Sequence, residues 1–598
     1  MLDLRFSILA GRAEISADDK YSYNLQVLRT RFSSSRSLSE LAFDVEIDDL
    51  LVNLGVLATW PADDTDIRWD ERLLRLVVGN AEDANVLQTK LTSAPLHEKP
   101  ITLSSSWKAG LTDFQKRDIA KLLTLTHGAN FSVPGAGKTR VSLAVFHSRR
   151  TAGTVTRMLV VCPKAAYESW RNEARECFPD SPVRVALMDS TTPPEADIVL
   201  VNYERLPDAR PALINWLKSQ PALLVLDEAH RMKLGAAGAW GAACLALGPY
   251  AAVRMILTGT PAPNGAKDLE NLFGFVWPGQ GRAQVSRALE DRDMRAASSY
   301  LRPLYARTTK KELGLPPVDI SVRRVDLPPL HRDLYNALLG QASTAWRGST
   351  EDIESLGKIL LYMLMAATTP ALLATGASKY EPLPYRIPPL IPVPNSSLAE
   401  LMRDLPQYEL SPKYQEVVRI VAENARKGRK TLVWSTFVRN LKSLEFLLSM
   451  YAPAIVHGGS SDREEQILRF RNDKNCFVLL SNPATLGEGV SLHHDCHDAV
   501  YVDRDFSAGR FMQSLDRIHR LGLPKDTETR ITILVANETI DELVVQRLAI
   551  KLKFMGGVLD DPAVTELADL SEELNETVGM DADDFACLKA YLSGHASC

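Results

Sequence analysis

Short apolar runs recur along the chain, and the stretches between them have the spacing of amphipathic helices. A first series lies between about residues 105 and 325, with runs at 158–163, 197–202, 223–228 and 254–259. A second series has runs at 431–436, 454–459, 476–481, 499–503 and 531–536. Short buried strands that alternate with helices are typical of a parallel sheet. The pattern therefore predicts an α/β fold with two parallel-sheet lobes in tandem.

The segments outside these two series have other patterns. Leu2 to Leu9 alternates apolar and polar residues like a half-buried strand, and Leu73 to Val78 is a second candidate strand. The stretch 326–368 has the spacing of an amphipathic helix, and 369–412 is rich in proline, which interrupts both helices and strands. We predict five parts: an accessory α/β domain at 1–100, lobe 1 at 101–325, a helical insertion and linker at 326–410, lobe 2 at 411–555, and an acidic tail at 556–598.

Composition narrows the class of protein. The chain has 598 residues, 45% of them hydrophobic and 24% charged, which is ordinary for a globular protein of several domains. No run of about twenty apolar residues and no basic-then-apolar leader is present, so we expect a cytoplasmic protein without a membrane span. The seven cysteines form no Cys-x-x-Cys pair, which predicts reduced thiols. A formal charge of −5 does not exclude nucleic acid, because a binding groove needs only local Lys and Arg.

A glycine-rich segment at 132–139, Ser-Val-Pro-Gly-Ala-Gly-Lys-Thr, precedes a helical pattern. Gly135 and Gly137 would let the backbone turn its N–H groups toward phosphate oxygens. Lys138 would neutralise the β- and γ-phosphates, and the Thr139 hydroxyl would bind Mg²⁺. Taken alone, the segment also fits an ordinary strand-to-helix turn.

Two acidic residues follow an apolar run in the segment Leu-Leu-Val-Leu-Asp-Glu-Ala-His at 223–230. The end of a buried strand is the edge at which parallel α/β sheets bind ligands. Asp227 there would hold Mg²⁺, and Glu228 would act as the general base on the attacking water. The alternative is a solvated helix start, where acidic residues are also favoured.

These motifs, in this order, resemble those of the Swi/Snf-type ATPases of helicase superfamily two, over about 105–550. The segment 111–115 resembles the glutamine motif that reads adenine, and 305–317 (YARTTKKELGLPP) resembles a segment typical of this family. The strongest resemblance is QSLDRIHRLG at 513–522, similar to helicase motif VI. Further similar segments are motif Ia at 160–170, the DEAH sequence at 227–230, motif III at 257–264, an entry helix at 411–421 and motif IV at 431–437.

Other segments depart from the family pattern. The motif V segment at 481–494 keeps Gly487 and Gly489 but carries Glu488 where the family is usually neutral, and Pro263 stands where glutamine is frequent. The departures indicate a divergent bacterial or phage branch. His493, His494, Cys496 and His497 are interpreted as a polar turn, because their dense spacing lacks the pattern of paired metal ligands.

The resemblance implies a set of site residues. Arg517 and Arg520, three apart and expected on one helix face, would be arginine fingers for an ATP held by the opposite lobe. Lys138, Asp227 and Glu228 would complete the catalytic set. ATP would be bound by Gln115, Pro134, Gly135, Ala136, Gly137, Lys138, Thr139, Arg140, Gly489 and Gln513, and Mg²⁺ by Thr139 and Asp227. Nucleic acid would contact Lys164, Thr258, Lys310, Lys311, Thr436 and Ser481.

The function that the resemblance implies is an ATP-dependent translocase on double-stranded DNA. Two alternatives stay open: a strand-separating DNA or RNA helicase, and an ATPase subunit of a multiprotein anti-phage defence or restriction complex. The segments 305–317 and 513–522 weigh against the first alternative, and the complete set of ATPase motifs weighs against a purely structural role.

Overall fold

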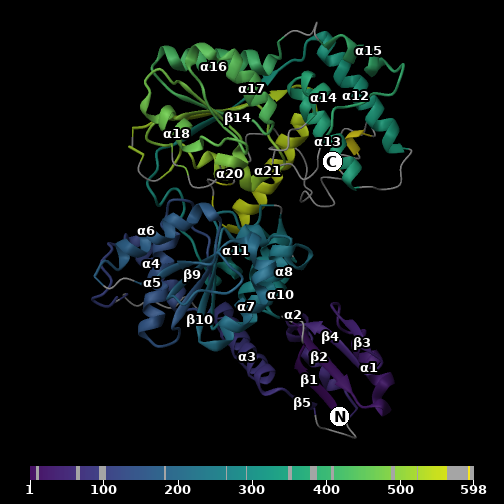
Figure 1. Ribbon diagram of the computed structural model, residues 1–598, viewed down its shortest axis with the longest axis vertical. Coiled ribbons are helices and arrows are strands. Elements are labelled where there is room, and N and C mark those ends of the chain that lie inside the picture. Colours follow the sequence, from purple (N-terminus) through teal and green to yellow (C-terminus); the bar gives the residue numbers. More distant parts are fainter. Residues whose placement is uncertain are drawn as a thin grey trace. The chain divides into compact units, whose positions relative to one another are not determined.

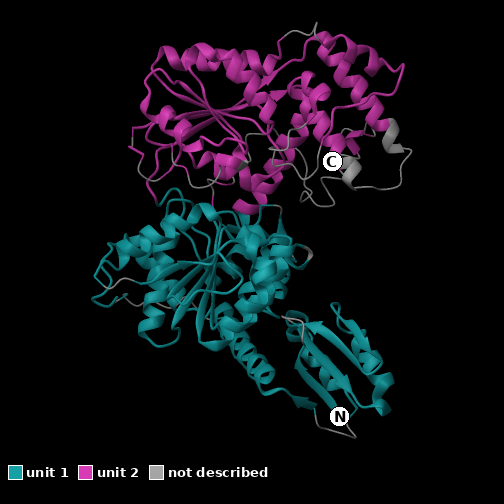
Figure 2. Cartoon of the chain, in the orientation of Figure 1, with its two compact units in different colours: residues 1–312, 557–560 teal, residues 313–556, 561–598 magenta. Residues whose placement is uncertain are grey.

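The structure is a computed structural model in which the chain divides into two compact units, Met1–Glu312 with Gly557–Asp560, and Leu313–Gly556 with Asp561–Cys598 (Figure 1, Figure 2). The described residues are 1–7, 12–61, 67–92, 101, 103–180, 183–263, 265–290, 293–347, 353–376, 387–405, 410–486, 490, 492–520, 523–524, 526–559, 561, 564, 587 and 590–592.

The first unit begins with a small α/β domain built on a five-stranded sheet, in the order β3-β4-β2-β1-β5. All neighbouring strands are antiparallel except β1 and β5. A long helix, α3, follows this sheet. The elements are β1 (Leu2–Phe6), β2 (Arg12–Ala17), α1 (Ser22–Arg29), β3 (Arg36–Ser39), β4 (Ala42–Glu46), α2 (Ile47–Val52), β5 (Ile67–Trp69) and α3 (Glu71–Thr92).

The predicted strand at Leu73 to Val78 is wrong, because these residues lie inside α3. Leu73 and Val77, four apart, are buried, whereas Leu74 and Val78 are exposed. Burial with a period of four residues is that of a helix, since a strand buries every second residue. The apolar run fits the period of a helix as well as that of a strand. The helical pattern of the mostly polar residues that follow it favours the helix.

The rest of the first unit contains a seven-stranded sheet in the order β12-β6-β11-β10-β7-β9-β8, and all its strand pairs are parallel. Its strands are β6 (Gly128–Asn130), β7 (Arg157–Val161), β8 (Val185–Leu187), β9 (Ile198–Val201), β10 (Ala222–Asp227), β11 (Val253–Leu257) and β12 (Tyr305–Ala306). The helices are α4 (Asp113–Leu123), α5 (Lys138–Thr151), α6 (Tyr167–Cys177), α7 (Leu206–Ser219), α8 (Ala239–Leu247), α9 (Ala266–Val276), α10 (Gly281–Leu289) and α11 (Met294–Leu301).

Apolar side chains of α4, α5 and α6 form one core with the central strands of this sheet. Every residue of β10 is buried, as expected for a strand covered on both faces. The predicted parallel α/β lobe is confirmed. Its functional edge is therefore the one where the strands end and the chain enters the following helices.

The second unit contains a six-stranded sheet in the order β13-β18-β17-β14-β16-β15, again with only parallel pairs. Its strands are β13 (Val318–Val325), β14 (Thr431–Trp434), β15 (Ala454–Val456), β16 (Val478–Ser481), β17 (Asp498–Tyr501) and β18 (Thr529–Ala536). Its helices are α16 (Pro412–Arg426), α17 (Val438–Leu447), α18 (Arg463–Asn472), α19 (Pro483–Leu486) and α20 (Ala508–Leu515), and α21 (Ile540–Leu559) runs on into the residues grouped with the first unit.

The structure puts β13 in this sheet, although we expected residues 318–325 to close the first lobe. It pairs over its whole length with β18, the last strand of the second series. A strand that pairs with a segment about two hundred residues later has no local signal for its partner, so the sequence pattern does not reveal where it belongs.

The insertion between β13 and α16 contains α12 (Pro329–Arg347), α13 (Ile353–Thr368), α14 (Ala371–Thr375) and α15 (Ser397–Arg403). The stretch 326–368 therefore holds two helices and not one. Near the C-terminus, the Tyr591 hydroxyl lies 3.0 Å from that of Tyr335 on α12, so this part of the acidic tail packs against the insertion.

The described cysteines test the expectation of reduced thiols. Five cysteines are free and buried, namely Cys162, Cys177, Cys244, Cys476 and Cys496. Cys587 is disulfide-bonded, which corrects the expectation of reduced thiols throughout. Isolated cysteines in a sequence do not reveal a pair that comes together only in the fold.

Among the parts of the chain that the structure describes, none of the helices combines the length and apolar composition needed to cross a bilayer.

A buried polar network attaches α3 to the seven-stranded sheet. The Asp83 carboxylate of α3 contacts Nε2 of His127 at 2.6 Å and accepts a hydrogen bond from the Arg254 guanidinium at 2.9 Å. His127 Nδ1 accepts from the backbone N–H of Arg254, so the proton of a neutral ring lies on Nε2 and points at Asp83. Burial, together with the charge of Arg254, lowers the pKa of His127 to about 4.

This network predicts an acid-sensitive step in the stability of the first unit. The folded protein binds its proton on His127 only near pH 4, whereas the unfolded chain binds it near pH 6.5. The free energy of unfolding should therefore fall by about 3 kcal/mol as the pH drops from 6.5 to 4. Urea denaturation of wild type and His127→Gln across this range measures it. The variant should have the shallower pH dependence, and parallel curves would show that other groups control the acid response.

Candidate ATP-binding site

The glycine-rich segment forms the turn between β6 and α5, at the carboxyl edge of the first parallel sheet. Gly135 and Gly137 have φ values of 88° and 79°, a left-handed backbone that glycine adopts at little cost. Lys138 is the first residue of α5, and its Nζ donates a hydrogen bond to the carbonyl oxygen of Ser132 at 3.0 Å. The loop is therefore closed around its own lysine at a helix N-terminus, where the helix dipole favours a bound phosphate.

Gln115 fixes the middle of this loop from α4. Its Nε2 donates to the carbonyl oxygen of Ala136 at 3.2 Å, and its Oε1 accepts from the backbone N–H of Thr112 in a capping box that begins the helix. A Cβ atom on Gly137 would lie 2.3 Å from Gln115 Nε2. Position 137 thus requires glycine for two reasons: its φ angle is positive, and Gln115 fills the space that a Cβ atom would need.

Asp227 and Glu228 follow at the end of β10, at the same edge of the sheet. The Asp227 carboxylate is buried and accepts hydrogen bonds from Trp170 Nε1 at 2.9 Å and from the backbone N–H of Glu228 at 3.0 Å. Burial and the charge of Glu228 raise the pKa of Asp227 to about 6, although the charge of Lys138 opposes them. Lys138 and Asp227 are therefore within electrostatic reach of each other, as a shared phosphate and metal site requires.

Glu228 has a left-handed backbone, with φ 51° and ψ 50°. Its carboxylate is partly exposed and lies 3.5 Å from His230 Nδ1, which in turn lies 3.3 Å from the Thr258 hydroxyl. The residues of the DEAH segment and of the motif III segment are thus in contact. This contact connects the candidate general base to the strand next to β10.

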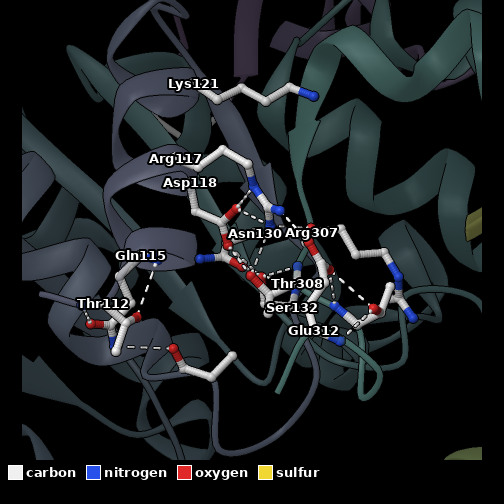
Figure 3. A network of polar contacts seen from close by, with 12 residues as sticks. Thr112, Gln115, Arg117, Asp118, Lys121, Asn130, Ser132, Arg307, Thr308 and Glu312 are labelled. Carbon is white, nitrogen blue, oxygen red and sulfur yellow. Dashed lines mark hydrogen bonds and ion pairs between the residues drawn. The ribbon is translucent and has the colours of Figure 1, made fainter. Parts of the chain in front are cut away.

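A buried carboxylate that the sequence analysis did not identify lies behind the loop. Figure 3 shows Asp118 on α4 facing both Ser132, the residue that opens the loop, and Thr308, which follows β12. Asp118 Oδ2 accepts hydrogen bonds from the Ser132 hydroxyl at 2.9 Å and from the Thr308 hydroxyl at 2.8 Å. The only sequence signal was Ser132 itself, a hydroxyl at the position where the general loop pattern has glycine.

Several predicted ATP contacts have other partners in this structure. The Arg140 guanidinium forms ion pairs with Glu173 and Glu176 of α6. The Arg517 guanidinium, mostly buried, donates to the backbone carbonyls of Gln513 at 3.1 Å and Val490 at 2.9 Å. Pro134, Ala136 and Thr139 lie in the loop or at the start of α5, and Gln513 lies on α20. Gly489 lies outside the described residues.

Neither arginine of motif VI lies on a helix, which corrects our expectation. α20 ends at Leu515, and the chain then turns through residues 516–519 before Arg520. In this turn the N–H groups of Arg517 and Ile518 donate to carbonyls three residues back, which tightens the chain at the end of the helix. Arg520 is partly exposed, in contrast to Arg517.

The predicted nucleic-acid contacts divide into exposed and buried residues. Lys164 and Lys311 are exposed, and Lys310 is partly exposed. Thr258, Thr436 and Ser481 are buried, and the Ser481 hydroxyl donates to the carbonyl of Val456 at 2.7 Å. Of the six residues, the three lysines therefore present their side chains to solvent, while the roles of all six stay predictions.

Comparisons with known proteins match both lobes. The SNF2-related domain matches residues 131–369, and the helicase conserved C-terminal domain matches residues 412–522. The chain is 25% identical over 458 residues to "Chromodomain-helicase-DNA-binding protein 1-like" of Danio rerio. This match covers 71% of the chain and 41% of the relative.

Two further matches are of the same kind. The chain is 25% identical over 524 residues to "SWI/SNF-related matrix-associated actin-dependent regulator of chromatin subfamily A member 1" of Mus musculus, covering 81% of this chain and 47% of the relative. It thus spans less than half the length of either relative. The solved structure "Sulfolobus solfataricus SWI2/SNF2 ATPase core in complex with dsDNA" is 20% identical, with a TM-score of 0.34, and the match covers 80% of this chain and 100% of that one.

The SNF2-related match covers β7 to β12 of the first sheet with the glycine-rich loop and the DEAH segment, and it extends through β13 to α13. The C-terminal match covers β14 to β17 of the second sheet and the motif VI arginines. The chain therefore combines an SNF2-related domain with a helicase conserved C-terminal domain, and it is homologous to the SWI/SNF ATPases of helicase superfamily two.

Proposed function

We propose that this protein is an ATP-dependent translocase on double-stranded DNA, which moves along DNA or remodels protein–DNA complexes at the expense of ATP. The observation that carries the proposal is the joint position of Lys138 and Asp227 at one sheet edge, within electrostatic reach of each other. A phosphate-binding lysine and a buried carboxylate so placed suit a nucleotide triphosphate with its metal ion. Homology to SWI/SNF ATPases supports duplex DNA as the polymer.

The residues at this edge fit a magnesium ion. Thr139 offers a hydroxyl and Asp227 a carboxylate, and oxygen donors of this kind are the ligands that Mg²⁺ prefers. We propose that these two residues hold it, where its charge would neutralise the β- and γ-phosphates. Glu228 would take the proton of the attacking water, and Lys138 would hold the phosphates in line.

We propose that Arg517 and Arg520 complete the site from the second lobe as arginine fingers. Hydrolysis would then change how the two lobes hold the nucleotide. If the lobes alternately grip the sugar-phosphate backbone, each ATP advances the protein along the polymer without reading its sequence. Lys164, Lys310 and Lys311 are the proposed backbone contacts with solvent-exposed charge.

We further propose that the protein belongs to a bacterial or phage branch of the family, is located in the cytoplasm, and has protein partners in a defence or remodelling complex. We also propose the five-part division of the chain, except that β13 belongs with the second lobe.

The proposal is tested by the rate of ATP hydrolysis measured alone, with duplex DNA, with single-stranded DNA and with RNA, at matched nucleotide concentration. We expect strong stimulation by duplex DNA only, and displacement of a third strand from a triplex by the moving protein. Stimulation only by single strands or RNA, together with strand separation, would favour a helicase. No stimulation by any polymer would contradict the proposal for the isolated chain and favour a subunit that needs a partner.

The raised pKa of Asp227 predicts how this activity depends on pH. The carboxylate is the charged form, and in the metal-free protein it is lost as the pH falls through about 6. Below that pH a proton competes with Mg²⁺ for Asp227, so the Mg²⁺ concentration that gives half-maximal ATP hydrolysis should rise about tenfold for each pH unit. Trp170→Phe removes the indole N–H that stabilises the charged carboxylate, so this rise should begin at a higher pH. Magnesium titrations of the ATPase rate of both proteins across this pH range measure the effect, and an identical pH dependence would exclude Asp227 as its origin.

A further inference from the structure

The network around Asp118 joins two segments that are far apart in the sequence. The backbone N–H of Thr308 donates to the Ser132 hydroxyl at 2.8 Å, and the N–H of Val133 donates back to the carbonyl of Thr308 at 3.1 Å. The start of the phosphate loop therefore runs beside the residues after β12 (Figure 3). Both hydroxyls of this contact, from Ser132 and Thr308, donate to the same oxygen of Asp118.

One side of the network reaches the phosphate-binding lysine. The Ser132 hydroxyl donates to Asp118, and the Ser132 carbonyl accepts a hydrogen bond from Lys138 Nζ. A phosphate that binds Lys138 competes with the Ser132 carbonyl for the ammonium group. Any resulting movement of Ser132 acts directly on its hydrogen bonds with Asp118 and Thr308, because Asp118 is only 2% exposed and surrounded by protein.

The other side of the network reaches the connection between the two units. Glu312 is the last residue of the first unit before the chain enters the second at Leu313. Its carboxylate accepts from the backbone N–H of Thr309 at 2.7 Å and forms an ion pair with Arg117. Arg117 also donates to Asp118 at 2.9 Å and to the carbonyl of Arg307 at 2.9 Å. The segment 307–312, here called the connector, is thus held by Arg117 and Asp118 of α4, and Asp118 also holds the start of the loop.

We propose that Asp118 is a positioning residue that couples the nucleotide state of the phosphate loop to the connector between the two units. The inference rests on the proposed function and deepens it, since it names the path by which bound nucleotide reaches the other lobe. Asp118 touches neither ATP nor the reacting atoms. It keeps Ser132 and Thr308 in one hydrogen-bonded unit, so that the loop and the connector shift together.

Amide hydrogen exchange tests this coupling without requiring catalysis. The probe is the non-hydrolysable analogue adenylyl imidodiphosphate with magnesium, and the readout is exchange in peptides that cover the phosphate loop and residues 305–312. In wild type we expect the analogue to slow exchange in both segments. In Asp118→Asn and in Thr308→Val, it should slow exchange in the loop but not in the connector. Asp208→Asn, an exposed carboxylate of the same unit, is the matched control.

Kinetics provide a second readout that a general loss of stability would not reproduce. Asp118→Asn and Thr308→Val should each lower the kcat of DNA-stimulated ATP hydrolysis about tenfold, with the KM for ATP changed less than about twofold. The double variant should be no slower than either single variant, because both changes break the same unit. Thr308→Ser, which keeps the hydroxyl, should restore the rate. Melting temperatures identify any variant that is partly unfolded at the assay temperature.

The outcomes separate the inference from the proposed function. Equal protection of the connector in wild type and both variants, or additive losses of kcat, would overturn the role of Asp118 and leave the ATPase proposal intact. Failure of the analogue to protect the phosphate loop in wild type would overturn ATP binding at this site, and the inference with it.

Discussion

Replacing Glu228 by glutamine is expected to lower the rate of DNA-stimulated ATP hydrolysis by about 10³-fold. The amide has the size of the carboxylate but does not accept a proton from the attacking water. ATP affinity should change by less than about twofold, because Lys138 and the loop backbone are untouched. Steady-state ATPase assays and equilibrium binding of a fluorescent ATP analogue measure the two effects separately.

Glu290→Gln is the matched control for this experiment, since Glu290 is an exposed glutamate at the end of α10 in the same unit. It should retain the wild-type rate and its stimulation by duplex DNA. A Glu228→Gln protein that hydrolyses ATP at the wild-type rate would remove Glu228 from the role of general base. A variant that no longer binds ATP would assign Glu228 to nucleotide binding instead.

Removing the side chain of Arg520 should lower kcat for ATP hydrolysis by about 10³-fold, with a smaller loss of stability than the removal of the Arg517 side chain. Arg520 is partly exposed, so water can reach the space that its truncation leaves. Arg517→Ala should slow hydrolysis and also destabilise the second unit by about 2 kcal/mol, because its guanidinium donates to two backbone carbonyls. The two arginines of one motif are thus predicted to differ in their stability effects.

Single-turnover ATPase rates and urea denaturation of both variants test this difference. Arg426→Ala, at an exposed arginine that ends α16, controls for the loss of a positive charge in the same unit. Wild-type hydrolysis by Arg520→Ala would exclude it as an arginine finger. Equal destabilisation by both changes would show that Arg520 is as structural as Arg517.

Much of the fold follows from the apolar runs alone. Each of the nine runs contains or overlaps a strand, because a fully buried parallel strand is apolar on both faces. The failures have physical causes. The residues Leu73 to Val78 fit two periods, and β13 pairs with a strand distant in sequence. Neither ambiguity is resolved by local pattern, since tertiary contacts decide both.

The candidate site was predictable where backbone chemistry dictates the residue. Gly135 and Gly137 are needed for positive φ, and Asp227 and Glu228 stand at the end of a buried strand. The partners of these residues were not predictable. Trp170, which donates to Asp227, lies in the motif Ia segment without any sign of this role. Asp118 is one of 74 acidic residues, and only its burial between Ser132 and Thr308 distinguishes it.

The left-handed backbone of Glu228 has an evolutionary consequence. A residue with a Cβ atom in that conformation costs the fold about 1 kcal/mol or more relative to glycine, and asparagine tolerates it better than glutamate. Variants selected only for thermal stability should therefore accumulate glycine or asparagine at position 228. Such proteins would be more stable but would lack the proposed general base. Glutamate at position 228 is therefore expected to persist only where selection acts on the rate of ATP hydrolysis.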